Sequence, residues 1–321
     1  MGQDTRLGRR LLAGLALAAP AIARAQGRTT RVINAYSPGG TADVVCRILF
    51  AALGARMGQG FAVENRPGAA GTIAAQAVAR APADGATLLY DATAHSVNPA
   101  LFGSRLPYDT QRDLLPVFLA MVTPNTLMAN LDFPARTVPA LIDLAKSRPG
   151  RLDCATTGIG TAQHVSLELF NHLAGTRIAH VAYREMASAR NDLTAGRVPL
   201  QFSNVPTTLP LVQAGQVACL AHTGPAPVGV LPGVPGLAET LPGFETWEWN
   251  GVFAPAGTPP GLIRELNAAL NAVIAEPATL ERLTGLGALT RPNTVEEFAA
   301  FRAQQIEFFA GMVRMANIRI D

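Results

Sequence analysis

The chain of 321 residues is long enough for one large or two ordinary domains, and its 49% of hydrophobic residues suffices for a sizeable core. The formal net charge of +3 comes from the first 25 residues, which hold four Arg and one Asp; without them, 22 Lys and Arg balance 22 Asp and Glu. The rest of the chain therefore has no basic excess that would favour a nucleic-acid partner.

Residues 1–25 have the order of a secretory signal peptide. Arginines precede the apolar run "LLAGLALAAPAIA", and "ARA" provides an A-x-A cleavage site that ends at Ala25. The alternative is a membrane anchor, but a membrane span needs roughly 20 apolar residues and a proline interrupts this run. We expect export to the periplasm and a mature chain that begins at or near Gln26. The pair Arg9-Arg10 leaves the twin-arginine and the ordinary export routes both open.

Strand and helix patterns alternate from residue 31 on, which predicts an α/β fold with a parallel sheet covered by helices. In the first part of the chain, "SPGG" leads directly into an Ala-rich apolar helix, and a short apolar run reads as a buried strand. Strands are expected at 31–36, 61–66 and 86–92, and helices at 41–57 and 73–81. The run "DLLPVFLAM" then leads towards a second unit.

The second unit repeats these kinds of element. Thr137 is the expected N-cap of one helix, which Pro149-Gly150 stops, and Gly175 ends another. The expected strands are 126–131, 151–158, 178–183, 198–205 and 217–224, and the expected helical segments are 137–150, 161–175, 188–196 and 208–215. The segment 246–255 then crosses back, and two terminal helices follow near 259–275 and 294–314.

This order predicts two lobes, with 28–125 in lobe 1 and 126–247 in lobe 2. A chain that leaves one lobe and returns to it crosses between them twice, and two crossing segments make a natural hinge. We place the bending points near 120–128 and 245–253.

Three cysteines, Cys46, Cys154 and Cys219, are too few and too widely spaced for a disulfide framework. Export would place them in an oxidising compartment. Cys46 falls in a predicted helix and the other two fall in apolar strand-like runs, so buried thiols are expected. A bridge between Cys154 and Cys219 is the alternative.

Four turns between a strand and a helix are rich in small residues. They are "SPGGTAD" (37–43), "RPGAAGT" (66–72), "DATAHSVN" (91–98) and "TTGIGTAQH" (156–164). Ligands of parallel sheets bind at the carboxyl ends of strands, where such turns gather. Glycine lets backbone amides approach a ligand, and a helix N-terminus offers unpaired N–H groups and a positive dipole end. One such turn could be only a tight turn, but four together favour an anion site that needs no Lys or Arg.

Three side chains in these turns have two interpretations each. Asp43 lies in the first turn of its helix, where an acid complements the dipole, or it accepts a hydrogen bond from a ligand. His95 and His164 either make hydrogen bonds at a helix start or contact a ligand.

Motifs of catalysis and metal binding are missing from the sequence, which has no GxSxG, SxxK, HExxH or CxxC motif and no P-loop. His164, His172 and His180 recur at intervals of eight, which suits neither a helix turn nor a metal chelate. We therefore expect a protein that is not an enzyme and has no cofactor and no metal.

The motifs "SPGGTAD", "VENRPGAAG", "PADGATLL" and "VFAPAGTP" follow one another in a specific order. In this order, over nearly all of residues 30–321, the chain resembles the Bug (TctC-type) family, the extracytoplasmic solute receptors of tripartite tricarboxylate transporters. The resemblance implies a two-lobed, type II-like periplasmic binding protein with a central cleft, in which 248–321 returns to lobe 1. It implies a small carboxylate-containing metabolite as ligand, bound through backbone amides, and the membrane subunits of the transporter as partners. We expect a monomer.

The candidate ligand-binding residues come from the four turns and from the ends of later strands. They are Ser37, Gly39, Gly40, Thr41, Asp43, Gly68, Ala69, Gly71, Thr93, His95, Ser96, Thr157, Gly160, Thr161, His164, Tyr183, Arg184 and Asn204.

One segment departs from the family pattern. After the strand "HVAY", family members usually have Lys-Gly and further small residues, whereas Tyr183 is followed here by "REMASA". Glu185 and Met186 therefore change the ligand set expected on that side of the cleft. Two other functions stay open: a solute sensor that feeds a signalling partner, and a secreted α/β hydrolase with an unrecognised active site.

Overall fold

The structure is a computed structural model that describes residues 29–319. The predicted signal peptide, residues 1–25, lies outside the described residues. Three parallel strands form the N-terminal end of the sheet, where β1 pairs with both β2 and β3. The strands are β1 (Thr30–Asn34), β2 (Phe61–Asn65) and β3 (Thr87–Ala92), and the helices that connect them are α1 (Thr41–Met57) and α2 (Thr72–Ala79).

A second parallel group has β5 between β6 and β7. The predicted helix signals of this group are confirmed: the Thr137 side chain accepts a hydrogen bond from the Ala140 amide, and Gly175 ends α5 in the left-handed conformation. Its elements are α4 (Val138–Ser147), β5 (Asp153–Thr156), α5 (Ala162–Ala174), β6 (Ala179–Ala182), α6 (Met186–Thr194), β7 (Leu200–Asn204) and α7 (Val205–Gln213).

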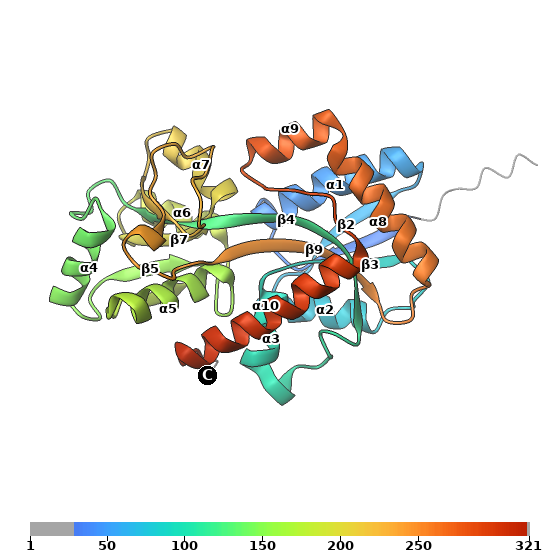
Figure 1. Cartoon of the computed structure of the whole chain (residues 1–321), viewed down its shortest axis with the longest axis horizontal. Helices are drawn as coiled ribbons and strands as arrows, with labels where there is room; N and C mark the ends of the chain where they lie inside the picture. Colours follow the sequence, from blue (N-terminus) through green and yellow to red (C-terminus); the bar gives the residue numbers. More distant parts are fainter. Residues whose placement is uncertain (1–28, 320–321) are drawn as a thin grey trace, which may run out of the picture.

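Two long antiparallel strands, β4 (Leu114–Ala129) and β9 (Trp247–Pro255), join these groups into one sheet. Figure 1 shows both strands running through the middle of the molecule. On one side β9 pairs with β3, and on the other β4 pairs with β7 and with β8 (Ala218–His222), all antiparallel. The predicted α/β fold is confirmed, but the sheet is mixed and not parallel at its centre, because β4 and β9 cross between the groups instead of belonging to a strand–helix–strand unit.

The remaining helices include two that the sequence pattern did not predict, α3 (Ala94–Phe102) and α9 (Pro277–Gly285). The two predicted terminal helices are confirmed as α8 (Pro260–Ala275) and α10 (Val295–Met315). Short 3-10 segments are η1 (Ala69–Gly71), η2 (Gly103–Arg105) and η3 (Leu237–Glu239). Within residues 29–319, no helix is both long and apolar enough to cross a membrane.

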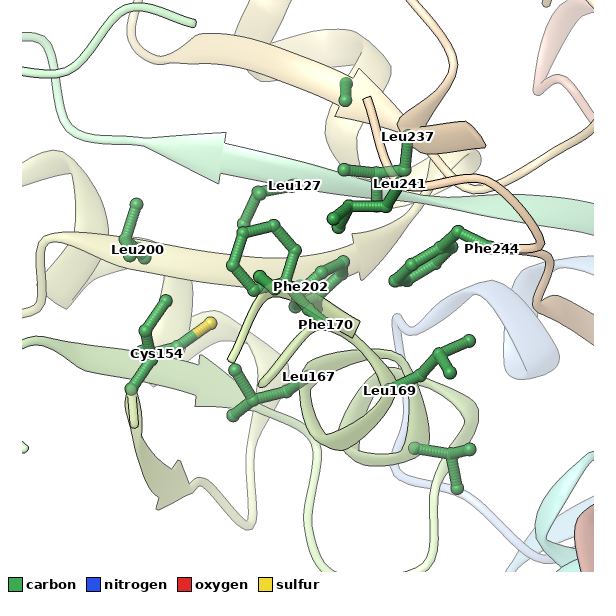
Figure 2. Close-up of a cluster of buried hydrophobic side chains, with 14 of the residues drawn as sticks. Leu127, Cys154, Leu167, Leu169, Phe170, Leu200, Phe202, Leu237, Leu241 and Phe244 are labelled. Atoms are coloured by element: carbon green, nitrogen blue, oxygen red, sulfur yellow. The ribbon is translucent and has the colours of Figure 1, made fainter. Parts of the chain in front are cut away.

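Separate hydrophobic clusters lie in the two halves of the sheet. In one, Phe170 of α5 and Phe202 of β7 pack with Leu127 of β4 and with Phe244, as Figure 2 shows. In the other half, α1 and α8 cover β1, β3 and β9. All three cysteines are free, so the alternative of a bridge between Cys154 and Cys219 is wrong.

Helix α10 packs against both halves. Near its start, Phe298 is fully buried against Trp249 and Phe253 of β9, and near its end, Phe309 belongs to the cluster around Phe170. Gly251 makes the first contact feasible, since a Cβ at this position would collide with the Phe298 ring. The helix therefore rests on the crossing strand only because residue 251 has no side chain.

We expect Gly251→Ala to lower the free energy of unfolding by roughly 1–3 kcal/mol, the usual cost of overpacking a core. The matched control is Gly311→Ala in α10, where a Cβ would meet nothing within 4 Å. That change should raise stability by about 0.5–1 kcal/mol, because Ala loses less backbone entropy than Gly. Urea unfolding followed by circular dichroism measures both, and a Gly251→Ala protein as stable as the natural one would contradict the packing argument.

Candidate functional site

A cavity of about 820 Å³ opens between the two parallel strand groups. Its walls come from the segments that follow β1, β2, β5, β6 and β7, together with Ala94 and Phe102 of α3 (Ala94–Phe102) and one residue of the crossing strand β9. The lining residues are Ala35, Tyr36, Ser37, Pro38, Gly39, Gly40, Thr41, Ala42, Pro67, Gly68, Ala69, Ala70, Gly71, Ala94, Phe102, Thr157, Gly158, Ile159, Thr161, Ala162, Gln163, Ala182, Tyr183, Arg184, Glu185, Met186, Ala187, Arg190, Asn204 and Glu248.

Five helices direct their N-termini at this cavity, since the N-cap residue of each lines it. The helices are α1, α2, α5, α6 and α7, with N-caps Gly40, Gly71, Thr161, Glu185 and Asn204. The first-turn amides of a helix have no partner inside the helix, and its N-terminus carries a partial positive charge. Such an arrangement can hold an anion, and among the described residues that line the cavity the cations are Arg184 and Arg190.

The "SPGG" turn is held in place from behind by Asp43. This buried carboxylate accepts hydrogen bonds from the Gly39 amide at 3.0 Å, from Arg47 Nε at 3.0 Å and from Asn65 Nδ2 at 2.8 Å. Burial alone would raise the pKa of Asp43, but the bonds from Arg47, Gly39 and Asn65 outweigh it and lower the pKa. Asp43 does not line the cavity, so it orders the turn that does.

The "PGAAG" turn contains four consecutive residues with positive φ: Gly68, Ala69, Ala70 and Gly71. Side chains rarely adopt this left-handed region, so the turn is held by its surroundings. The Gly71 amide donates to the Gly68 carbonyl at 3.0 Å, and Asn98 Nδ2 of α3 donates to the Ala70 carbonyl at 2.9 Å. A Cβ on Gly71 would come within 3.0 Å of Asp91 Oδ1, so glycine also allows α2 to approach β3 closely.

Polar contacts bridge the cavity from one strand group to the other. Thr41 Oγ1, at the start of α1, donates to Asn204 Oδ1 at 2.7 Å and lies 3.1 Å from Thr207 Oγ1. Ser37 Oγ donates to Glu185 Oε1 at 3.3 Å. The N-termini of α1 and α7 therefore face each other with a hydroxyl and an amide oxygen between them.

A buried acid lines the inner part of the cavity. Glu248 of β9 is only 7% exposed, and its neighbours are the side-chain amides of Gln163, at 3.4 Å, and Asn250, at 3.3 Å. Burial raises the pKa of Glu248 to about 8, although the bonds from Gln163 and Asn250 lower it and Asp91 adds to the rise. Gln163 in turn bonds Thr157 and Asn125, so one network joins the acid to the second strand group.

Of the 18 sequence-predicted residues, 12 line the cavity and six do not. Those that line it are Ser37, Gly39, Gly40, Thr41, Gly68, Ala69, Gly71, Thr157, Thr161, Tyr183, Arg184 and Asn204. The six that do not are Asp43, Thr93, His95, Ser96, Gly160 and His164.

Three of the six, Thr93, His95 and Ser96, follow β3. The unpredicted helix α3 points their side chains into the protein core. His95 is fully buried, lies 3.2 Å from Asp91 Oδ2 and stacks on the Phe253 ring at 4.2 Å between centroids. Its pKa is lowered, mainly by burial. Thr93 Oγ1 accepts a hydrogen bond from the Trp249 amide at 2.8 Å, and Ser96 is fully buried.

Gly160 and His164 support the second strand group. His164 Nδ1 accepts a hydrogen bond from the Gly160 amide at 3.2 Å, and its ring stacks on His180 at 4.0 Å. A Cβ on Gly160 would lie 2.6 Å from Leu101 Cδ1 of α3, so this glycine serves packing between the two groups. Among the described residues, no cluster of three or more His, Cys, Asp or Glu could hold a metal ion.

Several lining residues were missed by the sequence prediction, chief among them Glu248 and Gln163. Glu248 gave one usable signal, because it is an acid in the largely apolar segment 246–255, which was expected to cross back between the lobes. Gln163 gave none, because an amide in a helix start has no special pattern.

Comparisons with known proteins give consistent matches. The TctC family, described as tripartite tricarboxylate transporter family receptor, matches residues 45–314. A "UPF0065 protein in tcbD-tcbE intergenic region" of Pseudomonas sp. strain P51 is 37% identical over 91% of this chain and 89% of its own length. Protein BugT of Bordetella pertussis is 32% identical over 91% of this chain and 90% of its own length.

Solved structures match equally well. R. palustris Rpa4515 with adipate has a TM-score of 0.87 at 32% identity and covers 91% of this chain and 98% of its own. MatC of Rhodopseudomonas palustris with bound malate has a TM-score of 0.84 at 31% identity. The match covers 89% of this chain and 99% of the MatC chain. This chain therefore has the fold of periplasmic binding proteins.

We expect Gly40→Val to weaken the binding of a simple carboxylate such as hexanoate by 10-fold or more, because the added side chain blocks approach to the α1 N-terminus and a charge-assisted hydrogen bond is worth about 1.5–3 kcal/mol. The fold should tolerate this change, since Gly40 has φ −79° and a Cβ there would meet only the Ser37 carbonyl at 3.7 Å. Isothermal calorimetry measures the affinity, and Gly261→Val, at an exposed position of α8, is the control. A folded Gly40→Val protein with natural affinity would contradict binding at this amide site.

Proposed function

This chain belongs to the tripartite tricarboxylate transporter receptor family, and from this premise we propose that it is an extracytoplasmic receptor that binds a small carboxylate-containing metabolite for uptake by a tripartite tricarboxylate transporter. The family match and the similarity to BugT confirm the resemblance to Bug (TctC-type) proteins. Members of this family are periplasmic solute receptors. The observation that carries the proposal is the convergence of five helix N-termini on one cavity.

The ligand class follows from the chemistry of the cavity. Backbone amides and dipole ends suit a carboxylate as well as a phosphate, and the similarity to Rpa4515 with adipate and MatC with malate favours a carboxylate. The receptor works as a monomer exported to the periplasm, and its protein partners are the membrane subunits of the transporter. It has no nucleic-acid partner, and carries no cofactor.

The proposed function includes a motion in which the two lobes close over the ligand. Lobe 1 consists of 28–125 and 248–321 and lobe 2 of 126–247, with bending at 120–128 and 245–253 on the crossing strands. In β4, the pairing register with β9 shifts between Leu119 and Met121, and that with β8 shifts between Leu127 and Met128. Such irregularities bend a strand locally, which supports hinges there.

We expect small-angle scattering to show a smaller radius of gyration in saturating hexanoate or adipate than in buffer, because the lobes close on the ligand. Thr41→Val removes the hydroxyl that bridges to Asn204 and Thr207, so the ligand-free protein should become more open while keeping its fold. Identical profiles with and without a bound acid, as verified by calorimetry, would indicate a rigid pocket.

Specificity at the far end of the cavity depends on the segment "REM". Glu185 is exposed to the cavity, and its carboxylate contacts Ser37, whereas Met186 Sδ turns inward, 3.3 Å from Gln201 Nε2. A second ligand carboxylate placed beside Glu185 would meet a like charge. Arg184 also lines the cavity and its fork can pair with a carboxylate, so it opposes this effect. We propose that Glu185 dominates and that the receptor prefers a monocarboxylate with an apolar, neutral or cationic far end over a symmetric dicarboxylate.

Calorimetry with hexanoate and adipate, acids of equal length, tests both the function and this preference. The natural protein should bind hexanoate more tightly, and Glu185→Gly should shift the affinity ratio towards adipate by roughly 5-fold, since two charges about 4 Å apart in water interact with about 1 kcal/mol. Glu185→Gln separates charge from bulk, and Glu281→Gln on α9 is the control.

Each outcome of this experiment has a distinct meaning. Binding of neither acid, nor of any member of a wider carboxylate panel in thermal-shift assays, would contradict the receptor proposal. Tighter binding of adipate by the natural protein, or a ratio unchanged in Glu185→Gly, would contradict only the role of Glu185. Turnover of a bound acid would favour a hydrolase, and gene neighbours without two membrane subunits would favour a sensor.

A further inference from the structure

Glu248 is an acid in a place that is built for an anion. It lies on the crossing strand β9, lines the cavity and is 7% exposed. Its two carboxyl oxygens are each approached by a neutral amide: Gln163 Nε2 lies 3.4 Å from Oε2, and Asn250 Nδ2 lies 3.3 Å from Oε1. Among residues 29–319, no Lys, Arg or His forms an ion pair with it.

The titratable groups that face Glu248 come from two other elements, and none supplies a positive charge. Asp91 and Tyr90 belong to β3, and Tyr36 follows β1. From α5 it is faced by the neutral Gln163. Burial and the nearby Asp91 carboxyl both disfavour a charged Glu248, which agrees with its raised pKa of about 8.

We propose that Glu248 is a neutral carboxylic acid in this receptor and donates its proton in a hydrogen bond to a carboxylate oxygen of the bound metabolite. This inference rests on the proposed function, namely that the cavity takes a carboxylate. Both oxygens of Glu248 already accept hydrogen bonds from amides. The O–H of the neutral carboxyl is therefore the group that can hydrogen-bond to a ligand in the cavity.

The energetics favour the neutral form of Glu248 when an acid is bound. An ionised Glu248 would repel a ligand carboxylate in a low-dielectric cavity, where like charges interact far more strongly than in water. A neutral carboxyl instead forms an O–H···O⁻ bond, which is among the stronger hydrogen bonds in proteins. Glu248 thereby selects for an acceptor group and against bare apolar or cationic groups at the inner end of the ligand.

The consequence is a pH-dependent affinity. A ligand carboxylate nearby raises the pKa of Glu248 in the complex above its value of about 8 in the free receptor. Below pH 8 both states hold the proton, so affinity is level. Above pH 8 the free receptor loses its proton and binding must take one up, so affinity falls, by up to tenfold for each pH unit. A ligand that presents an ammonium to an ionised Glu248 would give the opposite slope.

Calorimetry with hexanoate and adipate between pH 6 and about 9.5 tests this proposal on the full mature protein. The affinity of the natural protein should be level up to about pH 8 and should then fall by tenfold or more. Measurements in two buffers of different ionisation enthalpy should show an uptake approaching one proton near pH 9 and almost none at pH 6. Glu248→Gln carries an amide donor that cannot ionise, so its affinity should stay level over the same range, while Glu281→Gln should follow the natural protein.

Carbon-13 NMR of the Glu248 carboxyl, assigned by comparison with Glu248→Gln, provides a readout without ligand. It should show a titration near pH 8 that moves upward when hexanoate or adipate is bound. A titration below pH 6, an affinity that rises with pH, or equal pH profiles for the natural protein and Glu248→Gln would overturn the role of Glu248. In each of these cases acid binding itself would leave the receptor function standing, whereas failure of all acids to bind would refute that function and this inference together.

Discussion

The antiparallel pairing of β4 with β9 is the interaction on which the rest of the structure depends. These strands are paired from Leu114–Pro255 to Pro124–Trp247, and each carries one parallel group on its outer side. Because β9 runs opposite to β3 and β4 runs opposite to β7, the carboxyl ends of the two parallel groups point towards each other across the crossing strands. The helices that follow those ends then meet with their N-termini at one place, so the position of the cavity is set by the strand topology and does not depend on particular side chains.

This geometry explains how a cavity with few cations can bind an anion. Its positive potential comes from backbone amides and dipole ends, and buried acids adjoin it: Asp43 behind the α1 turn, Asp91 behind the α2 turn and Glu248 on the crossing strand. Asp43 is paired with Arg47. Asp91 lies beside His95 and accepts a hydrogen bond from the Ala92 amide. Glu248 has only neutral amides, so it is the acid that can keep its proton and serve as a donor. Neutralising an acid here costs less than burying a second charge beside a bound carboxylate.

Much of the fold could be predicted from the sequence because its signals are local. The helix 41–57 follows a glycine pair and ends at a left-handed Gly58. Thr137 marks the start of α4, and Gly175 marks the end of α5. The continuity of β4 and the helix α3 could not be predicted, because contacts distant in sequence decide them. The same limit explains the site. The turns were found by their composition, but whether Thr93 or His95 faced the cavity depended on α3, and the position of Glu248 depended on the crossing strand.

The glycines, which occur in three of the four turns, also show that one residue type meets two physical demands. Gly71 and Gly160 are needed for packing, since a Cβ would press on Asp91 or on Leu101. Gly40 has an ordinary φ and room for a side chain, so packing does not require glycine there, which agrees with the proposed access of a ligand to the α1 amides. Gly39 combines a left-handed φ with open space, and its amide already bonds Asp43. In the "SPGG" turn, the amides left for the proposed ligand are therefore those of the first turn of α1, so some glycines of the pattern serve the scaffold and not the ligand.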